Sequence, residues 1–293
     1  MSATPAPVGR PPSFPPSVLI TGASTGIGAA CVAQLSARGW HVYASVRKAA
    51  DAERLQTQYG GRVSVLEFDV TDAAAVGAAG ARVVAERGER GLDGVVNNAG
   101  IAVAAPLEFL PIAELRHQLE VNVIGQVAVA QAVLPALRRA RGRIVLVGSI
   151  AGRSALPFTG AYSASKHALE AIADAWRVEL APFGVHVAIV EPGVIATPIW
   201  STAAAYAEAM LARLPPAVDH YYGRALDGLR ARAARGVKGL PPEHVARAVE
   251  HALTARRPRS RYLVGRDART RVWLQRLPDR LRDRLILAGV KRL

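Results

Sequence analysis

The sequence is poor in cysteine and in long apolar runs. Cys31 is the single cysteine among 293 residues, so no internal disulfide and no cluster of metal-binding thiols can form. Short apolar segments are interrupted by charges, glycine and proline, and none is typical of a membrane span. Residues 1–16 hold six prolines without the basic start or apolar core of a secretory signal. We expect a cytoplasmic protein without a bound metal, beginning with a disordered leader at 1–16.

Acidic residues are also few, 23 against 37 Lys and Arg, which gives a net charge of +14. Most of the excess lies in residues 256–293, where 13 basic residues face three Asp. Such a tail can be a solvated helical face, or it can meet an anionic membrane surface or an acidic partner. No element that reads bases accompanies the charge, so we do not expect a nucleic acid as partner.

From residue 17 onward, short β-branched runs alternate with longer helical segments. This alternation is typical of β-α-β units that feed a parallel sheet. The pattern predicts a single doubly wound Rossmann-type α/β domain at 17–265, with a seven-stranded parallel sheet flanked by helices. The expected strands lie near 18–21, 41–46, 62–67, 93–96, 142–148, 185–191 and 260–264, and the expected helices near 26–38, 72–88, 111–139 and 160–181.

Two segments fall outside this alternation. A helical insertion at 198–239 follows the sixth strand, where it would hang over the ligand-binding end of the sheet. A basic amphipathic extension at 266–293 carries leucines at three- and four-residue steps, and Pro278 predicts two short helices in place of one. The apolar stripe of the extension could cover the insertion, contact another subunit or meet a membrane.

The segment TGASTGIG at 21–28 directly follows the first predicted strand and leads into a helix. Its glycines allow a sharp turn that brings backbone amides and a helix N-terminus close to a pyrophosphate. A glycine-rich turn can also simply join a strand to a helix. The position between a strand and a helix favours the dinucleotide interpretation.

The nucleotide type should be decided after the second strand, which ends without an acidic residue and is followed by Arg47 and Lys48. A guanidinium suits the 2′-phosphate of NADP(H), so we expect NADP(H) in preference to NAD(H). The alternative is a pair of ordinary surface cations. Asp69 after the third strand could accept a hydrogen bond from the adenine, or it could cap a helix, with Asp72 in the same loop.

Tyr162 and Lys166 lie four residues apart, so on a helix they project from one face. A phenol is a poor base at neutral pH, whereas a neighbouring ammonium stabilises the phenolate. Alone, such a pair is commonly a surface contact. Ser149 at the end of the fifth strand and Asn122 in the long helix before it would reach the same crevice.

Together these motifs resemble the short-chain dehydrogenase/reductase family, in unbroken order over roughly residues 17–265. The resemblance rests on TGASTGIG, Asp69, Asn97-Asn98-Ala99-Gly100, Asn122, Ser149, the Tyr162 and Lys166 pair, and Pro192-Gly193 with Thr197. It implies an oxidoreductase that transfers a hydride between NADP(H) and a carbonyl or alcohol. The weighed alternative is a regulatory or membrane-surface protein that keeps the fold without turnover.

The resemblance also implies a role for each matching residue. Tyr162 would be the acid/base, and Lys166 would lower its pKa and bind the nicotinamide ribose. Ser149 would polarise the substrate oxygen, and Asn122 would hold a water that links Lys166 to solvent. The implied cofactor-binding residues are Gly22, Ser24, Thr25, Gly26, Ile27, Gly28, Arg47, Lys48, Asp69, Val70, Asn98, Ala99, Gly100, Tyr162, Lys166, Pro192, Gly193, Ile195 and Thr197.

Within the family, the stretch VLITGASTGIG, the strand HVYASVR and the long helical insertion look most like the hydroxysteroid and retinol dehydrogenase branch. We therefore expect a lipophilic alcohol or carbonyl substrate, and a homodimer or homotetramer formed through the long central helices. An apolar inner face of the insertion would line the substrate site or pack on itself; its residues are Ile199, Trp200, Tyr206, Met210, Leu211, Leu214, Tyr221 and Tyr222.

Overall fold

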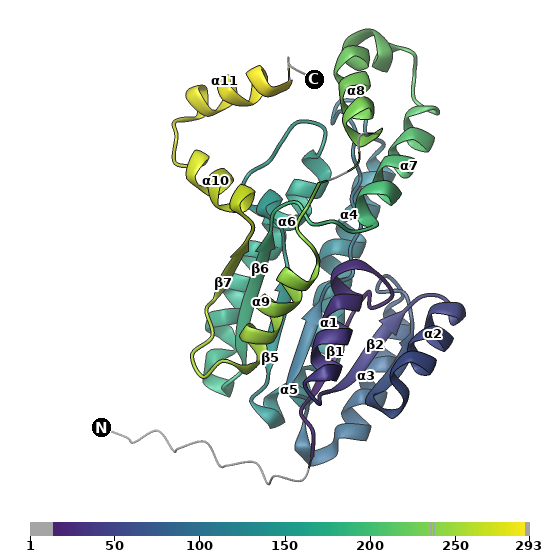
Figure 1. The fold of residues 1–293 in the computed structure, drawn as a ribbon, viewed down its shortest axis with the longest axis vertical. Helices are drawn as coiled ribbons and strands as arrows, with labels where there is room; N and C mark the ends of the chain where they lie inside the picture. The colour runs from purple at the N-terminus through teal and green to yellow at the C-terminus, as the bar shows by residue number, and fades with distance from the viewer. Residues whose placement is uncertain (1–13, 235, 237, 291–293) are drawn as a thin grey trace.

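The computed structural model describes residues 14–234, 236 and 238–290, so most of the predicted leader lies outside the described residues. The described chain forms one seven-stranded sheet in the order β3-β2-β1-β4-β5-β6-β7, with every neighbouring pair parallel (Figure 1). The strands are β1 (Ser17–Ile20), β2 (His41–Val46), β3 (Val63–Glu67), β4 (Gly94–Asn97), β5 (Arg143–Val147), β6 (His186–Pro192) and β7 (Arg261–Val264). Each predicted strand is confirmed to within one residue.

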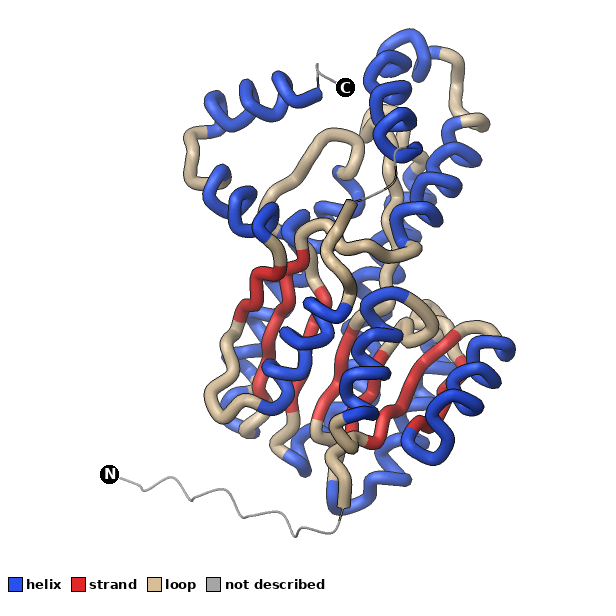
Figure 2. The backbone as a smooth tube through the Cα atoms, in the orientation of Figure 1, coloured by secondary structure: helices blue, strands red, loops and turns tan. Residues whose placement is uncertain are grey.

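Helices cover both faces of the sheet, as a doubly wound fold requires (Figure 2). One apolar core lies between the sheet and α1 (Gly26–Ala37), α2 (Ala49–Tyr59) and α9 (Glu243–Thr254). The opposite core lies under α3 (Ala73–Arg87), α5 (Gly125–Ala140) and α6 (Gly160–Glu179). Burial on both faces explains why β1 and β4 consist almost entirely of apolar residues, because neither face of these strands meets water.

The sequence pattern missed two helices. In α2 only Leu55 is buried, so most of that helix is polar and its periodic apolar signal is weak. In α9 the buried face includes Val245, Val249 and Leu253, but it also uses two alanines, which are uninformative in a chain rich in alanine. Both helices belong to the same layer of the fold.

The predicted long helix at 111–139 is a continuous helical segment that contains one π-helical turn. It consists of α4 (Ile112–Leu119), a π-helical turn at Glu120–Ile124 and α5. This run, 112–140, is long and apolar enough to cross a membrane by length and composition. The apolar face of α5 packs into the core beneath the sheet, which accounts for its composition.

The insertion and the C-terminal extension rise beyond the carboxyl ends of the strands (Figure 1). The insertion contains α7 (Ile199–Leu211) and α8 (Ala217–Ala234). The extension consists of α10 (Arg266–Leu274) and α11 (Asp279–Val290), so the predicted break at Pro278 is confirmed. Leu281 and Leu285 of α11 stay 46% and 49% exposed, and the apolar stripe is therefore not closed within the chain.

Candidate active site

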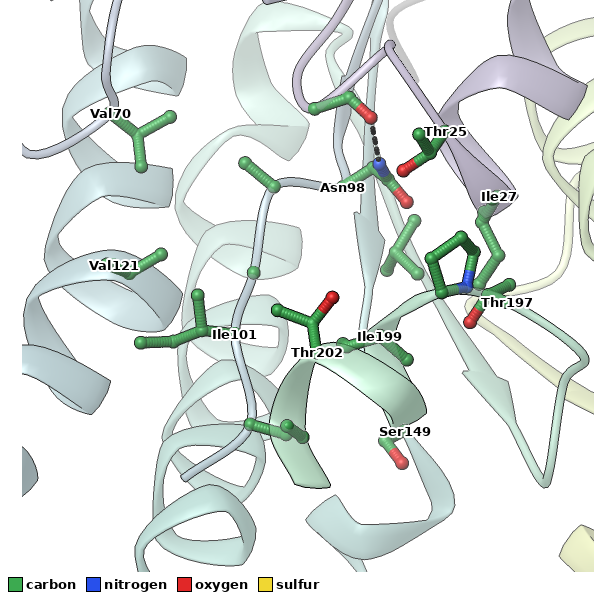
Figure 3. Close-up of a pocket in the computed structure, with 18 of the residues that line it drawn as sticks. Thr25, Ile27, Val70, Asn98, Ile101, Val121, Ser149, Thr197, Ile199 and Thr202 are labelled. Carbon is green, nitrogen blue, oxygen red and sulfur yellow. Dashed lines mark hydrogen bonds between the residues drawn. The ribbon is translucent and has the colours of Figure 1, made fainter. Parts of the chain in front are cut away.

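A cavity of about 340 Å³ lies at the carboxyl ends of the strands, where the strand order reverses between β1 and β4. Doubly wound folds bind ligands at this point. Segments far apart in the sequence contribute to its wall: Figure 3 shows Thr25 and Asn98 on one side, and Ser149 near Ile199 of α7 on the other. The lining residues thus come from segments between Gly22 and Tyr206.

The glycine-rich turn has the backbone geometry that its sequence predicts. Gly22 and Gly26 adopt φ values of +63° and +55°, which residues with a side chain rarely adopt. Gly28 does not line the cavity. A side chain there would collide with the Gly22 carbonyl, so Gly28 serves the packing of α1 against the turn.

Two hydroxyl groups that the sequence analysis did not single out hold this turn in place. The Thr21 hydroxyl accepts hydrogen bonds from the backbone amides of Asn98 and Ala99, each at 2.9 Å. The Asn98 amide group donates back to the Thr21 carbonyl, and the Ser45 hydroxyl accepts from the Gly22 amide at 3.3 Å. In the sequence, Thr21 follows the apolar strand β1 and Ser45 lies near the end of β2, and a hydroxyl residue in such a position can indicate a hydrogen bond to a neighbouring turn.

The residues after β2 and β3 meet at one end of the cavity. Arg47 and Asp69 both line it and form an ion pair at 3.5 Å, whereas Lys48 lies outside the lining. The Asp69 carboxylate also accepts hydrogen bonds from the backbone and hydroxyl of Thr71, and together these partners hold the pKa of Asp69 below its usual value in spite of burial. The cap of α3 is Asp72, which accepts from the Ala75 amide.

Tyr162, Lys166 and Ser149 line the same cavity. Burial raises the pKa of Tyr162, while its hydrogen bond with Ser149 and the positive charge of Arg271 act in the opposite direction. Lys166 is 5% exposed, and burial lowers its pKa to about 8. Its ammonium lies 5.8 Å from the centre of the Tyr162 ring and donates to the Val147 carbonyl at 2.8 Å. The Lys166 ammonium therefore lies near the aromatic ring of Tyr162.

Asn122 lies in the π-helical turn and is fully buried. Its side chain accepts from the Ile101 amide at 2.8 Å, and donates to the Ile101 carbonyl and to the Ser165 hydroxyl. It is absent from the residues that line the cavity. The structure thus brings Asn122 to the neighbourhood of Tyr162 through Ser165, which donates to the Tyr162 carbonyl. π-Helical turns are frequent at functional sites because they redirect one side chain.

The insertion supplies part of the far wall. Ile199, Trp200 and Tyr206 of α7 line the cavity, and the Trp200 indole donates to the Ile195 carbonyl at 2.7 Å. Other members of the predicted apolar face pack elsewhere. Met210 is buried in a small cluster with Leu110 and with Val103, which also lines the cavity, and Tyr221 is 67% exposed. Some apolar residues of the insertion therefore line the cavity, whereas others pack against the rest of the protein.

The residues around the turn fit a dinucleotide. Thr25, Gly26 and Ile27 at the N-terminus of α1 face the cavity. Thr25 makes no side-chain capping bond there, and no acidic residue occurs in the first turn. A pyrophosphate would meet backbone amides and the positive end of the helix dipole, without a competing carboxylate.

Comparison with known proteins agrees with this geometry. The sequence profile of the family described as short chain dehydrogenase matches residues 16–207. The chain belongs to the short-chain dehydrogenase/reductase family. The match spans the glycine-rich turn, the Tyr162 and Lys166 pair and the start of the insertion.

Individual relatives are similar to this dehydrogenase over nearly its whole length. Retinol dehydrogenase 5 of Mus musculus is 39% identical over 92% of this chain and 87% of its own length. The NADPH-dependent 3-dehydrocapnine reductase of Ornithobacterium rhinotracheale is 37% identical over 94% and 97%. The 17-beta-hydroxysteroid dehydrogenase type 6 of Homo sapiens is 37% identical over 92% and 87%.

A solved structure supports the fold independently. The short chain dehydrogenase from Burkholderia cenocepacia, in complex with NADP, superposes with a TM-score of 0.70 at 28% identity, covering 91% of this chain and 94% of that one. This dehydrogenase is therefore an oxidoreductase that acts on CH-OH groups with a nicotinamide cofactor, and it belongs to the retinol and hydroxysteroid branch.

Proposed function

We propose that this dehydrogenase interconverts a lipophilic alcohol and the corresponding ketone or aldehyde with NADP(H), using Tyr162 as the acid/base. The observation that carries the proposal is that Tyr162, Ser149 and Lys166 line one cavity with the glycine-rich turn. Hydride transfer requires the cofactor and the proton donor at the same carbon-oxygen bond, and this cavity has the glycine-rich turn and Tyr162 in its wall.

The nicotinamide, when bound, supplies or accepts the hydride. In reduction the Tyr162 hydroxyl gives its proton to the substrate oxygen, and in oxidation the phenolate takes that proton back. Ser149 donates a hydrogen bond to the oxygen on which negative charge develops, which stabilises the transition state. Lys166 holds a buried positive charge beside the ring, and the charge favours the phenolate.

The preference for NADP(H) rests on Arg47. It lines the nucleotide end of the cavity directly after β2, and no acidic residue ends that strand to hold a ribose 2′-hydroxyl. Asp69 pairs with the guanidinium at 3.5 Å and holds it near the cavity wall. The NADPH-dependent relative and the NADP complex are consistent with the same preference.

A lipophilic substrate is supported by the apolar residues of the cavity lining, which include Ile101, Val103, Val121, Ile199 and Trp200. The test is a panel of retinoids, hydroxysteroids, long-chain amino ketones, short aliphatic ketones and sugars, assayed with both cofactors as absorbance of the reduced nicotinamide. Turnover confined to the apolar substrates with NADP(H) is expected. Turnover of sugars alone, or of no compound, would contradict the proposal.

We also propose that the extension makes a peripheral contact with an anionic membrane surface. The half-exposed Leu281 and Leu285 lie four residues apart on one face of α11, and Arg280 and Arg284 share the adjoining face, as an interfacial helix requires. The homodimer or homotetramer expected from the family would form through α5 and α6, where Val178 is 72% exposed. Light scattering at micromolar concentration tests the oligomer.

A further inference from the structure

One face of α10 carries three polar residues spaced four apart: Asp267, Arg271 and Gln275, the last being the C-cap residue. Residues at this spacing share one side of a helix. Each of the three side chains makes a hydrogen bond to a segment that borders the candidate active site. All three belong to the basic C-terminal extension and to none of the sequence motifs described above.

Asp267 contacts the turn after β6. Its carboxylate accepts a hydrogen bond from the Val194 amide at 2.7 Å. The carboxylate lies so close to Gly193 that a side chain at Gly193 would collide with it. Pro192 and Gly193 both line the cavity. The first turn of α10 therefore fixes the strand end that forms one wall of the site.

Arg271 and Gln275 contact the loop that follows β5. The Arg271 guanidinium donates to the carbonyl of Ser154, and Gln275 donates to the Ser154 hydroxyl at 2.9 Å. Ser154 is 5% exposed and lies two residues after the short helix Ile150–Gly152, whose N-cap is Ser149. A displacement of Ser154 would be transmitted to Ser149 over a few residues of this tightly folded loop.

The charge of Arg271 also acts on Tyr162. Two cations influence this part of the site: Lys166, from the same helix as Tyr162, and Arg271, from α10. The positive charge of Arg271 lowers the pKa of Tyr162 against the effect of burial, and burial lowers the pKa of Arg271 itself. Asp267, one turn earlier on α10, favours the charged guanidinium, and Glu170 favours the charged form of Lys166.

We propose that Asp267, Arg271 and Gln275 are positioning residues through which α10 clamps the Ser149 loop to the Gly193 turn and holds the Arg271 guanidinium on that loop. The proposal rests on the acid/base role of Tyr162 proposed above. It makes the first helix of the C-terminal extension a part of the active-site architecture, and α11 contacts the clamp through Arg282, whose guanidinium donates to the Gln275 side chain at 3.1 Å.

The direct test measures the ionisation of Tyr162 without any substrate. The tyrosinate absorbance of each variant is titrated and corrected with the same variant carrying Tyr162→Phe. Arg271→Gln should raise the ionisation pH of Tyr162 by at least about half a unit, because a nearby cation is lost. Arg271→Lys keeps the charge and should recover most of the shift. Arg269→Gln, an exposed arginine of the same helix, is the matched control and should leave it unchanged.

Kinetics with the fastest alcohol of the panel and NADP⁺ supply the second readout. Asp267→Asn and Arg271→Gln should lower kcat/KM at least about fivefold, with Arg269→Gln at the parent value. Parent-like kcat/KM in both Asp267→Asn and Arg271→Gln overturns the clamp, and an unchanged ionisation pH in Arg271→Gln excludes an effect of its charge on Tyr162. If Tyr162→Phe abolishes turnover while the α10 variants behave as the parent, only this inference fails. If Tyr162→Phe is fully active, the proposed function fails.

Discussion

Tyr162 lies in surroundings that oppose its own ionisation. Burial raises its pKa, and the opposing influences come from Ser149 and from Arg271 on a distant helix. Tyr162 and Lys166 share one face of α6, as their spacing requires, but the ammonium lies over the ring and bonds to the Val147 carbonyl. The sequence thus predicted which residues meet, and the packing of α6 against β5 decided how they meet.

Replacing Tyr162 by Phe should keep the fold and the binding of NADPH, because only the hydroxyl is lost. We expect kcat to fall by at least about 10³-fold, within the range for loss of a general acid/base. The measurement is steady-state kinetics, together with NADPH binding by fluorescence. Ser163→Ala on the same helix, whose hydroxyl lies near Thr159, is the control. A kcat within tenfold of the parent would contradict the acid/base assignment.

Replacing Arg47 by Asp should move the cofactor preference from NADP(H) toward NAD(H). A hydrogen bond to a charged group contributes about 1.5 to 3 kcal/mol, so the ratio of kcat/KM for the two cofactors should change at least about tenfold. Arg62→Asp tests for an effect of net charge alone, because Arg62 is exposed and lies outside the cavity lining. A constant ratio in Arg47→Asp would mean that the guanidinium does not contact the nucleotide.

Among the secondary-structure elements, α6, β6 and β7 are joined by a compact cluster of charges. Arg261 of β7 pairs with Glu170 and Asp174 of α6 and with the fully buried Glu191 of β6. Burial and the nearby Glu191 carboxylate raise the pKa of Glu170 to about 7. The cluster orients the edge strand β7, from which α10 continues to the active site. The charges in this cluster therefore affect the strand that carries α10 and its clamp residues.

The raised pKa of Glu170 predicts a pH-dependent stability. A carboxyl whose folded pKa exceeds its unfolded value stabilises the fold at low pH, and this contribution is lost as pH rises toward 7. Glu170→Gln cannot ionise and still offers an acceptor to Arg261. Its Tm relative to the parent should therefore increase between pH 5 and pH 8, measured by calorimetry. The same substitution at the exposed Glu179 should have a small effect at both pH values. A difference that stays constant with pH for Glu170→Gln contradicts the prediction.

At the scale of the whole molecule, the extension divides into two parts with different environments. Helix α10 packs against β7 and bonds to the loops around the site, whereas α11 exposes its leucines. Figure 1 shows α11 extending beyond α10, away from the sheet. Catalytic and membrane roles can therefore be separated by truncation.

Deleting residues 277–293 removes the Arg282 bond to Gln275 but keeps the bonds of α10 to Val194 and Ser154, so kcat and KM should stay within about twofold of the parent. Binding to vesicles that contain an anionic phospholipid should fall at least tenfold, since each basic residue near such a surface contributes about 1 kcal/mol. Vesicles of phosphatidylcholine alone are the control. Equal vesicle binding before and after truncation would contradict the membrane contact. Deleting 267–293 should in addition lower kcat/KM.

The sequence by itself determined the sheet, the glycine-rich turn and the set of residues at the carboxyl ends of the strands. Those features depend on local periodicity and on spacing along one element, which a single chain records directly. Only the tertiary structure decided that Asn122 bonds to Ile101, that Gly28 serves packing, and that Arg271 bonds to the loop after β5. These contacts join elements remote in sequence, and the mutual packing of the elements fixes which side chains meet.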